Sequence, residues 1–268
     1  MSAKRGAERN GNESGGARAG SARDSRAPKA PTARAADREL PIGVFDSGLG
    51  GLTVIRQLRR KLPHEDFVYL GDTARVPYGN KSPQTVIRFA REDARFLLSQ
   101  RVKAIVVACN TASAWALPAL ERRFNVPIFG VILPGARAAI EKTRGKRIGV
   151  IATTATIRSR AYSNAILARD DSISVFARAC PLLAPLVEEG WTDNRVARLA
   201  LKEYLRPLLK RRIDTLVLGC THYPLLKRAI RAVAGRKIRL IDSAESCSLY
   251  VRDRLGALGL LEIGRAHV

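Results

Sequence analysis

The sequence contains few of the residues that mark several common protein classes. Its four cysteines form no Cys-x-x-Cys pair, so neither a zinc ribbon nor a dense disulfide scaffold is indicated. Its apolar runs are well short of the roughly 20 residues that cross a bilayer, so no membrane-spanning helix is expected. Aromatic residues make up only 6% and are not interleaved with basic ones, as they would be on a surface that stacks nucleic-acid bases.

Acidic residues are also scarce, with 24 against 47 basic residues and a net charge of +23. Residues 1–39 hold nine basic and five acidic residues, so most of the excess charge belongs to the rest of the chain. Such a charge keeps nucleic acids and anionic small molecules open as partners. The basic residues cluster near predicted helix ends, where they complement helix dipoles, and this favours a solvated surface over a nucleic-acid site. Their main clusters are at 59–61, 122–123, 142–147 and 210–212.

Residues 1–39 contain no Val, Ile, Leu, Phe, Tyr or Trp, which predicts a disordered basic tail over 1–40. A secretory signal needs an apolar central region, and a transit peptide is poor in acids, so we expect a cytoplasmic protein. At the other end, residues 262–268 read Glu-Ile-Gly-Arg-Ala-His-Val. A possible coding of this stretch resembles a sequencing adapter, so we expect 262–268 to be a non-native C-terminal tail.

From residue 41 onward, short β-branched runs alternate with helical patterns, which predicts an α/β fold with parallel sheets covered by helices on both faces. Ser82 and Pro83 have the pattern of a helix N-cap followed by proline at the first helical position. The chain length allows one large or two small domains. The predicted strands are 42–45, 67–70, 104–108, 128–132, 148–152, 173–176, 215–218 and 238–241.

Two sequence segments are repeated at similar spacing. Ile-Gly-Val at 42–44 recurs at 148–150, and Val-Val-Ala-Cys-Asn-Thr at 106–111 is matched by Val-Leu-Gly-Cys-Thr-His at 217–222. Each copy of the second segment puts a cysteine, Cys109 or Cys220, at the carboxyl end of a strand, where open α/β sheets bind ligands. Chance similarity between buried strands is the alternative explanation. The repeat predicts two pseudo-symmetric doubly wound units that face one cleft.

Both cysteines precede hydrogen-bonding residues, unlike an inert core thiol. A helix that begins just after each cysteine would lower the thiol pKa below its ordinary value of about 8.5. His222, two residues after Cys220, is a candidate proton partner, although a structural hydrogen-bonding role is the alternative. A disulfide is disfavoured in the cytosol. A metal site would have too few ligands in Cys109, Cys220 and His222 without another cysteine.

The loop Asp46-Ser47-Gly48-Leu49-Gly50-Gly51 connects a predicted strand to a helix but matches neither a dinucleotide fingerprint nor a P-loop. The carboxylate of Asp46 suits the ammonium group of a substrate, which together with nearby donors indicates an amino acid. Two thiols facing one amino acid could remove its α-proton from one side and return a proton to the other, which would racemise it without a cofactor. A second loop, 73–80, is rich in residues that form tight turns, and we weigh a site role equally with a turn.

Several motifs together resemble those of the cofactor-independent glutamate racemases. The resemblance extends from about residue 41 to 260. Related aspartate racemases tend to carry an acid where this chain has His222, so the substrate expectation depends on that histidine. The matching motifs are Phe-Asp-Ser-Gly at 45–48, Gly-Asp-Thr-Ala-Arg at 71–75, Pro-Tyr-Gly at 77–79, Ala-Cys-Asn-Thr-Ala at 108–112, Pro-Gly-Ala at 134–136 and Gly-Cys-Thr-His-Tyr-Pro-Leu-Leu at 219–226.

This resemblance implies that Cys109 acts on D-glutamate and Cys220 on L-glutamate, with Asp46 assisting near Cys109 and His222 near Cys220. Glu188 is implied to support the site indirectly. The reaction would need no cofactor and no metal, and would supply D-glutamate for peptidoglycan, hence for cell wall biogenesis and cell shape. The implied substrate contacts are Asp46, Ser47, Tyr78, Gly79, Asn110, Thr111, Thr153, Thr156, Thr221 and His222.

The resemblance also implies that the first domain is discontinuous, formed by 41–134 plus 243–261, with 135–242 as the second domain. Glutamate is the expected partner, a homodimer is possible, and neither a nucleic acid nor a membrane is expected. Two alternatives remain open: a racemase of the same family acting on aspartate or another amino acid, and a basic protein that binds nucleic acid or gyrase.

Overall fold

The computed structural model of the chain describes residues 35–262 and 264. The predicted disordered tail lies outside the described residues as far as residue 34, and so do positions 263 and 265–268 of the predicted C-terminal tail. Residues 35–40, which the sequence assigned to the tail, are part of the fold and include helix α1 (Ala35–Arg38). The Arg38 guanidinium donates to the Gly259 carbonyl at 2.7 Å, and the Lys103 ammonium donates to the Arg38 carbonyl. These two bonds hold a segment that has almost no apolar side chains.

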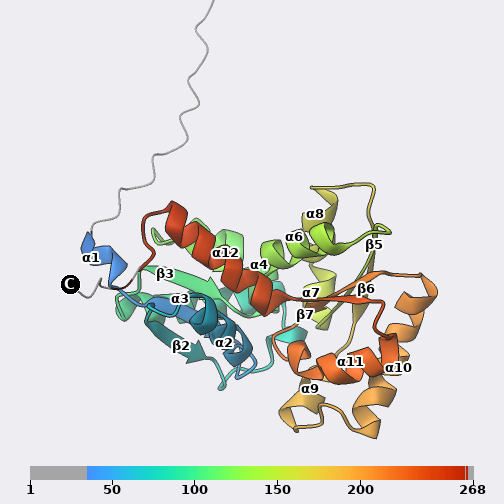
Figure 1. Cartoon of the computed structure of the whole chain (residues 1–268). Coiled ribbons are helices and arrows are strands. Elements are labelled where there is room, and N and C mark those ends of the chain that lie inside the picture. Colours follow the sequence, from blue (N-terminus) through green and yellow to red (C-terminus); the bar gives the residue numbers. More distant parts are fainter. Residues whose placement is uncertain (1–34, 263, 265–268) are drawn as a thin grey trace, which may run out of the picture. The chain divides into compact units, whose positions relative to one another are not determined.

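Eight strands form two parallel four-stranded sheets (Figure 1), which confirms the predicted α/β fold with two units. The first sheet has the order β2-β1-β3-β4 and the second the order β6-β5-β7-β8. Every paired register within them is parallel. The strands are β1 (Ile42–Asp46), β2 (Phe67–Gly71), β3 (Ala104–Val107), β4 (Ile128–Gly130), β5 (Arg147–Ala152), β6 (Ser174–Ala179), β7 (Thr215–Gly219) and β8 (Arg239–Asp242).

The two sheets repeat one topology, which explains the repeated sequence segments. The first Ile-Gly-Val segment is in β1 and its copy in β5, and each of these strands lies second in its sheet. Strands β3 and β7 are third in their sheets, and each ends immediately before its cysteine or one residue earlier. The two cysteines therefore occupy equivalent strand ends, so the predicted pseudo-symmetry is confirmed.

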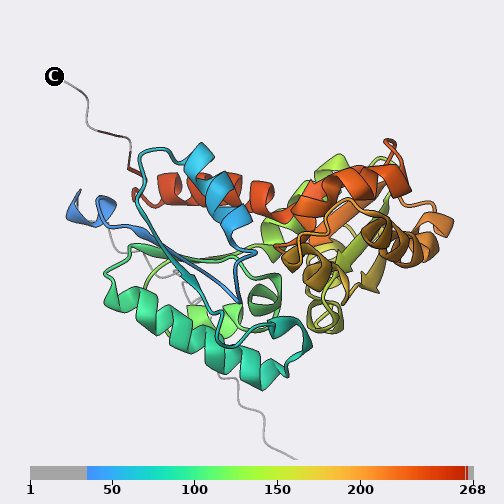
Figure 2. The same cartoon turned by 90° about the horizontal axis from the view of Figure 1, so that it is seen from below.

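The first sheet is covered on both faces because its strands are apolar on both sides. Ile42 and Val44 of β1 pack toward α2 (Leu52–Lys61) and α12 (Ser243–Ala257), whereas Phe45 packs toward the opposite layer. In Figure 2 the red α12 and the blue α2 lie on one side of this sheet and the long green α3 on the other. The opposite layer consists of α3 (Pro83–Ser99), α4 (Asn110–Trp115) and α5 (Leu117–Glu121).

The second sheet has the same arrangement. Ile148 and Val150 of β5 pack with α6 (Ile132–Lys142) and α8 (Ala161–Leu167), and Ile151 packs on the other face. That other face is covered by α9 (Leu183–Glu188), α10 (Arg195–Lys210) and α11 (Lys227–Ala234). Three short helices complete the described elements: α7 (Thr154–Arg158) and the 3-10 helices η1 (Tyr78–Asn80) and η2 (Tyr223–Leu226).

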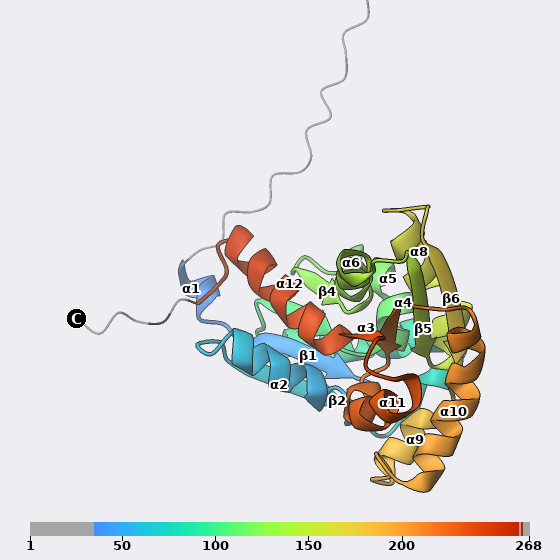
Figure 3. The ribbon, with the colours of Figure 1, turned by 45° about the vertical axis from the view of Figure 1, so that its right-hand side comes forward.

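The chain passes twice between the two halves. After β4 it enters α6, and after β8 it returns through α12, which lies beside α2 of the first half (Figure 3). The predicted boundary after residue 134 falls inside α6, because Ile132 and Ala136 already pack in the core of the second sheet. The strand predicted over 128–132 likewise ends at Gly130, since the next residues begin that helix.

The predicted cap at Ser82 is confirmed, because its hydroxyl accepts a bond from the Thr85 N–H at 3.2 Å and Pro83 occupies the first helical position. In the described part of the chain, every helix is too short or too polar to cross a bilayer.

Candidate active site

One cavity of about 200 Å³ is lined by residues of both halves of the chain, from the carboxyl ends of their strands. This volume suits a small metabolite, since pockets for drug-sized ligands span about 300–1,000 Å³. Asp46 and Thr156 do not line the cavity, although both contact residues that do. The predicted site residues that line it are Ser47, Tyr78, Gly79, Cys109, Asn110, Thr111, Thr153, Glu188, Cys220, Thr221 and His222.

Cys109 lies where β3 ends and caps α4, as the sequence predicted. Its sulfur accepts the Ala112 N–H at 3.4 Å, and its thiol lies 3.6 Å from the Ser47 hydroxyl. Only 5% of its surface is exposed. The thiol is therefore held at a helix N-terminus with one edge open to the cavity.

Cys220 lies at the equivalent end of β7, but no α-helix begins just after it. Proline is tolerated in the first turn of a helix, and Pro224 lies in the first turn of the short 3-10 helix η2, which starts at Tyr223. The α-helix α11 follows η2 and therefore begins seven residues after Cys220. Instead, the His222 ring approaches the thiol, with 3.6 Å between Nδ1 and Sγ. On the other side of the ring, Nε2 lies 3.1 Å from a carboxylate oxygen of Glu188. Thiol, imidazole and carboxylate thus form a row at the cavity wall.

Burial reverses the predicted effect on the thiol pKa. Loss of solvent around Cys109, with the negative charge of Asp46 nearby, raises its pKa to about 12 despite the Ala112 N–H. Loss of solvent also raises the pKa of Cys220, and the N–H of His222 opposes the shift. The prediction of lowered pKa values is therefore wrong for the free protein, because one helix end is weaker than the cost of burying a thiolate. In the free protein, burial therefore favours the protonated thiol at both positions.

Asp46 lies behind Ser47, fully buried at the end of β1. One of its carboxylate oxygens accepts the Gly51 N–H at 2.7 Å, and the other has no hydrogen-bond partner among residues 35–262 and 264. Burial raises the pKa of Asp46, and attraction to His222 counteracts this. Asp46 therefore lies behind the residues that line the cavity.

Asn110 presents a free donor at the cavity. Its amide oxygen accepts the Tyr162 hydroxyl at 2.7 Å, whereas its amide nitrogen is buried and has no partner in the described structure. In this arrangement the Tyr162 hydroxyl donates to the amide oxygen, which leaves the amide nitrogen without a partner. The nitrogen is therefore available to a carboxylate or another acceptor.

Three threonine hydroxyls close one side of the cavity. Thr111 lies 2.9 Å from Thr153 and 3.0 Å from Thr156, and the latter two are 3.0 Å apart. Thr111 belongs to the first half and the others to the second, so the cluster joins the two across the site. Thr156 contributes by orienting the hydroxyls of the two threonines that line the cavity.

The loop at 73–80 combines the two roles considered for it. The Tyr78 hydroxyl points toward Asp72 and Asp93 and lies within hydrogen-bonding distance of both carboxyl groups, at 2.9 Å from Asp93. Arg75 bonds the same two carboxylates at 2.7 and 2.8 Å. Gly79 then passes so close to the second half that a Cβ there would lie 2.7 Å from the Thr153 Cβ. A buried ionic network therefore sets the turn, and the turn forms one wall of the site.

Sequence reasoning missed part of the lining. Some of the missed positions lie in the loop 73–80, for which the sequence predicted turns but not which residues face a ligand. Pro185 lies three residues before the predicted site residue Glu188. The missed lining residues are Val76, Pro77, Asn80, Thr154, Pro181, Ala184 and Pro185. Their common signal is the density of prolines near the candidate residues, which predicts turns but not which turn faces the ligand.

Comparison with known proteins shows which family this chain resembles. The family model described as Asp/Glu/hydantoin racemase matches residues 42–247. A glutamate racemase of Geobacter metallireducens is 55% identical over 214 residues, which cover 80% of this chain and 79% of that protein.

Solved structures agree. A glutamate racemase isoform of Bacillus anthracis is 44% identical with a TM-score of 0.83, and the match covers 85% of each chain. The Francisella tularensis glutamate racemase, solved in complex with D-glutamate, is 40% identical with a TM-score of 0.80 and the same coverage of 85% of each chain.

Proposed function

The chain belongs to the Asp/Glu/hydantoin racemase family and to its glutamate racemases, and from this we propose that its cavity interconverts L- and D-glutamate by proton transfer between two thiols. The observation that supports this most directly is the placement of Cys109 and Cys220 at equivalent strand ends of two repeated sheets, both lining one cavity. A substrate between them offers one face to each sulfur.

In the proposed reaction, one sulfur acts as a thiolate and removes the α-proton, and the electron pair stays on the substrate as a carbanion. The opposite thiol then protonates that carbon from the other face. Cys109 acts on D-glutamate and Cys220 on L-glutamate. After one turnover the first sulfur holds the α-proton and the second has lost its own, so the two have exchanged protonation states. Loss of a proton from the first sulfur and uptake of one by the second restore the starting state, and no proton is consumed overall.

The raised thiol pKa values require a proton acceptor beside each sulfur. Asp46 has this role near Cys109, because burial already raises the pKa of its carboxyl toward that of a useful base. His222 has it near Cys220, from 3.6 Å, and Glu188 supports the resulting imidazolium across 3.1 Å. Two acceptors, one assigned to each thiol, suit a reaction that runs in both directions.

Substrate binding is assigned to the donors around the cavity. The free amide nitrogen of Asn110 and the hydroxyls of Ser47, Thr111, Thr153 and Thr221 suit the two carboxylates of glutamate. Tyr78 and Gly79 contribute the wall, and Thr156 and Asp46 act from behind it. His222 favours glutamate over aspartate as substrate, since related aspartate racemases tend to carry an acid there.

The wider role follows from the same family membership. We propose that the enzyme works in the cytoplasm as a homodimer and supplies D-glutamate for peptidoglycan, with glutamate as its small-molecule partner. We also propose two domains, 41–134 with 243–261, and 135–242, between which the chain crosses within α6. A homodimer would cover some of the exposed apolar side chains of the second half, such as Leu182, Trp191 and Leu199, and analytical ultracentrifugation tests it.

A chiral assay of the purified protein, without added pyridoxal phosphate or metal, tests the reaction. We expect racemisation of either glutamate enantiomer, a loss of at least about 10³-fold in Cys109→Ser and in Cys220→Ser, and wild-type rates in Cys247→Ser. Cys247 is a matched control because it is equally buried but packs in the core of the first sheet. If the wild-type protein does not racemise glutamate, the proposed function is refuted. Faster turnover of aspartate than of glutamate would favour the aspartate alternative. Wild-type racemisation in either site variant would refute the two-thiol mechanism.

A further inference from the structure

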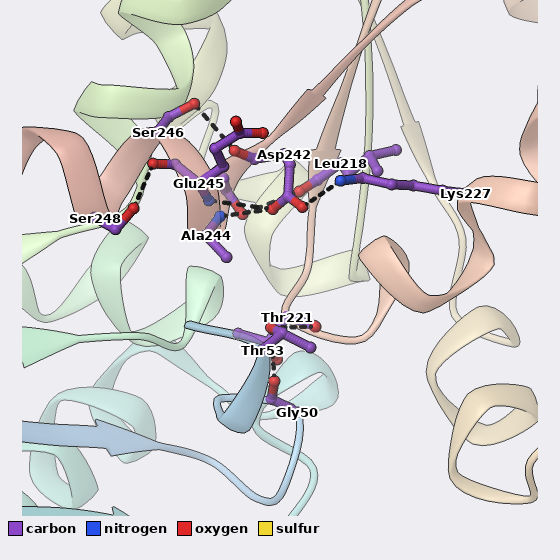
Figure 4. Close-up of polar contacts among 11 residues, drawn as sticks. Gly50, Thr53, Leu218, Thr221, Lys227, Asp242, Ala244, Glu245, Ser246 and Ser248 are labelled. Carbon is purple, nitrogen blue, oxygen red and sulfur yellow. Dashed lines mark hydrogen bonds and ion pairs between the residues drawn. The ribbon is translucent and has the colours of Figure 1, made fainter. Parts of the chain in front are cut away.

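The two halves of the chain meet directly behind the second thiol. Thr53, in the first turn of α2, has its hydroxyl 2.9 Å from the carbonyl oxygen of Thr221 in the other half, and 2.9 Å from that of Gly50 in its own loop. Figure 4 shows these three residues together. Thr53 is only 8% exposed, so its hydroxyl has no ready exchange with water.

The carbonyl that Thr53 contacts is part of the peptide unit between Thr221 and His222. A peptide unit is planar, so its C=O and N–H move together and point in opposite directions. The nitrogen of this unit belongs to His222, whose ring nitrogen Nδ1 lies 3.6 Å from the sulfur of Cys220. Thr53 therefore holds the backbone from which the His222 ring approaches the thiol.

A second contact holds the same segment. The loop after β1 passes so close that a Cβ on Gly50 would lie 2.4 Å from the Thr221 hydroxyl oxygen and 2.6 Å from His222 Cε1. The loop that carries Asp46 at its start thus rests against both residues that follow Cys220. No equivalent of this contact is needed by Cys109, whose N–H donor comes from its own helix.

We propose that Thr53 is a positioning residue for the second thiol: by holding the Thr221 carbonyl it fixes the backbone of His222, whose ring lies beside Cys220, across the boundary between the two halves. The proposal rests on the proposed function. It assigns Thr53 to one half of the reaction, the removal of the α-proton of L-glutamate by Cys220 and the return of a proton to make it. A residue that merely stabilised the fold would affect both halves alike.

Isotope effects distinguish these possibilities. Enantiomers have equal free energies in water, so kcat/KM must be equal in the two directions for every variant, and a rate alone cannot reveal which thiol is impaired. A primary isotope effect can, because α-deuterated L-glutamate reports transfer to Cys220 and α-deuterated D-glutamate reports transfer to Cys109. If proton transfer at Cys220 slows, the isotope effect with α-deuterated L-glutamate rises toward its full value. The isotope effect with α-deuterated D-glutamate then falls toward one.

The experiment uses the full-length protein with Thr53→Val, which removes the donor at nearly constant shape, and Thr53→Ser, which keeps it. We expect kcat/KM to fall about tenfold in Thr53→Val, with the isotope effects shifted in opposite directions, and to recover to within about twofold in Thr53→Ser. Thr143→Val is the control, because it removes a hydroxyl bond to Asp214 of 2.6 Å outside the cavity lining and should leave both effects unchanged.

Gly50→Ala provides a second variant in case Thr53→Val folds poorly, since the added methyl group displaces the same two residues from the other side. It should give the same opposite shifts. The proposal is overturned if the wild type racemises glutamate while Thr53→Val stays within twofold of it, if the two isotope effects move together, or if Thr53→Ser is as impaired as Thr53→Val. A wild type that does not racemise glutamate refutes the proposed function itself.

Discussion

Replacement of Tyr162 by phenylalanine tests how the site presents a donor to its substrate. The Tyr162 hydroxyl holds the Asn110 amide oxygen at 2.7 Å, and the amide nitrogen is thereby left for the ligand. Without that hydroxyl, the amide can rotate and turn its oxygen toward the cavity. An anionic substrate would then meet an acceptor where it now meets a donor.

The size of the effect can be worked out from this bond. A buried neutral hydrogen bond contributes about 1 kcal/mol, and an acceptor left without a partner costs about 1–3 kcal/mol. If the amide rotates, the free protein no longer leaves the Asn110 amide oxygen buried without a partner. The bound substrate then loses the donor that it meets in the wild type, so the cost appears in the substrate complex. A loss of about 1 kcal/mol on binding corresponds to roughly a fivefold rise in KM, given tenfold per 1.36 kcal/mol. We therefore expect KM for both enantiomers to rise about fivefold and kcat to change less.

Steady-state kinetics with both enantiomers, together with thermal unfolding, measure this. Tyr204→Phe is the matched control, because the Tyr204 hydroxyl accepts a weaker backbone bond of 3.4 Å outside the cavity lining and should leave KM unchanged. The isotope effects of Tyr162→Phe should not diverge between enantiomers, in contrast to those expected for Thr53→Val. An unchanged KM in Tyr162→Phe, with a melting temperature lowered by loss of the bond, would show that Asn110 does not bind substrate as described.

Two further predictions concern stability. Burial raises the pKa of Asp93 to about 7. The folded chain therefore keeps a proton that the unfolded chain releases near pH 3.9. The stabilisation that results is complete below about pH 4 and is lost as the pH rises through 7. The unfolding free energy of the wild type minus that of Asp93→Asn should fall over this range in urea titrations, and a constant difference would contradict the assignment. Lys103 pairs with Glu65 where both side chains are 1% exposed, so Lys103→Met should cost about 3–5 kcal/mol in the same titrations, and a loss below about 1 kcal/mol would show that the pair is not essential.

Much of the fold could be predicted because its signals are local. β-Branched runs, a serine before a proline, and a repeated Ile-Gly-Val identify strands and a helix start within a few residues of each other. The strand ends then place Cys109 and Cys220 without any knowledge of packing. The strand predicted over 128–132 was drawn too long because Ile132 is apolar in either a strand or a helix, and only packing on the second sheet decides between them.

The rest of the site depends on contacts between distant segments. Tyr162 is 52 positions from Asn110 and Thr53 is 168 from Thr221, and neither tyrosine nor threonine in a helix indicates such a partner. The thiol pKa values were misjudged for a related reason. A sequence shows that a helix can follow Cys109, but the desolvation that outweighs its dipole comes from a buried cluster whose members, such as Phe45 and Tyr78, lie far from it in the sequence.

The return of α12 to the first sheet has a consequence for synthesis on the ribosome. Ala244, Cys247, Val251 and Leu255 complete the core beneath β1 and α2, yet they are translated roughly 200 residues after β1. During that interval the second sheet can bury both of its faces from its own segment, whereas α2 covers only part of the face of the first sheet on which α12 later packs. The nascent chain therefore carries an apolar surface until nearly its last helix emerges, and a chaperone that binds such surfaces would engage the first half and be released when α12 docks.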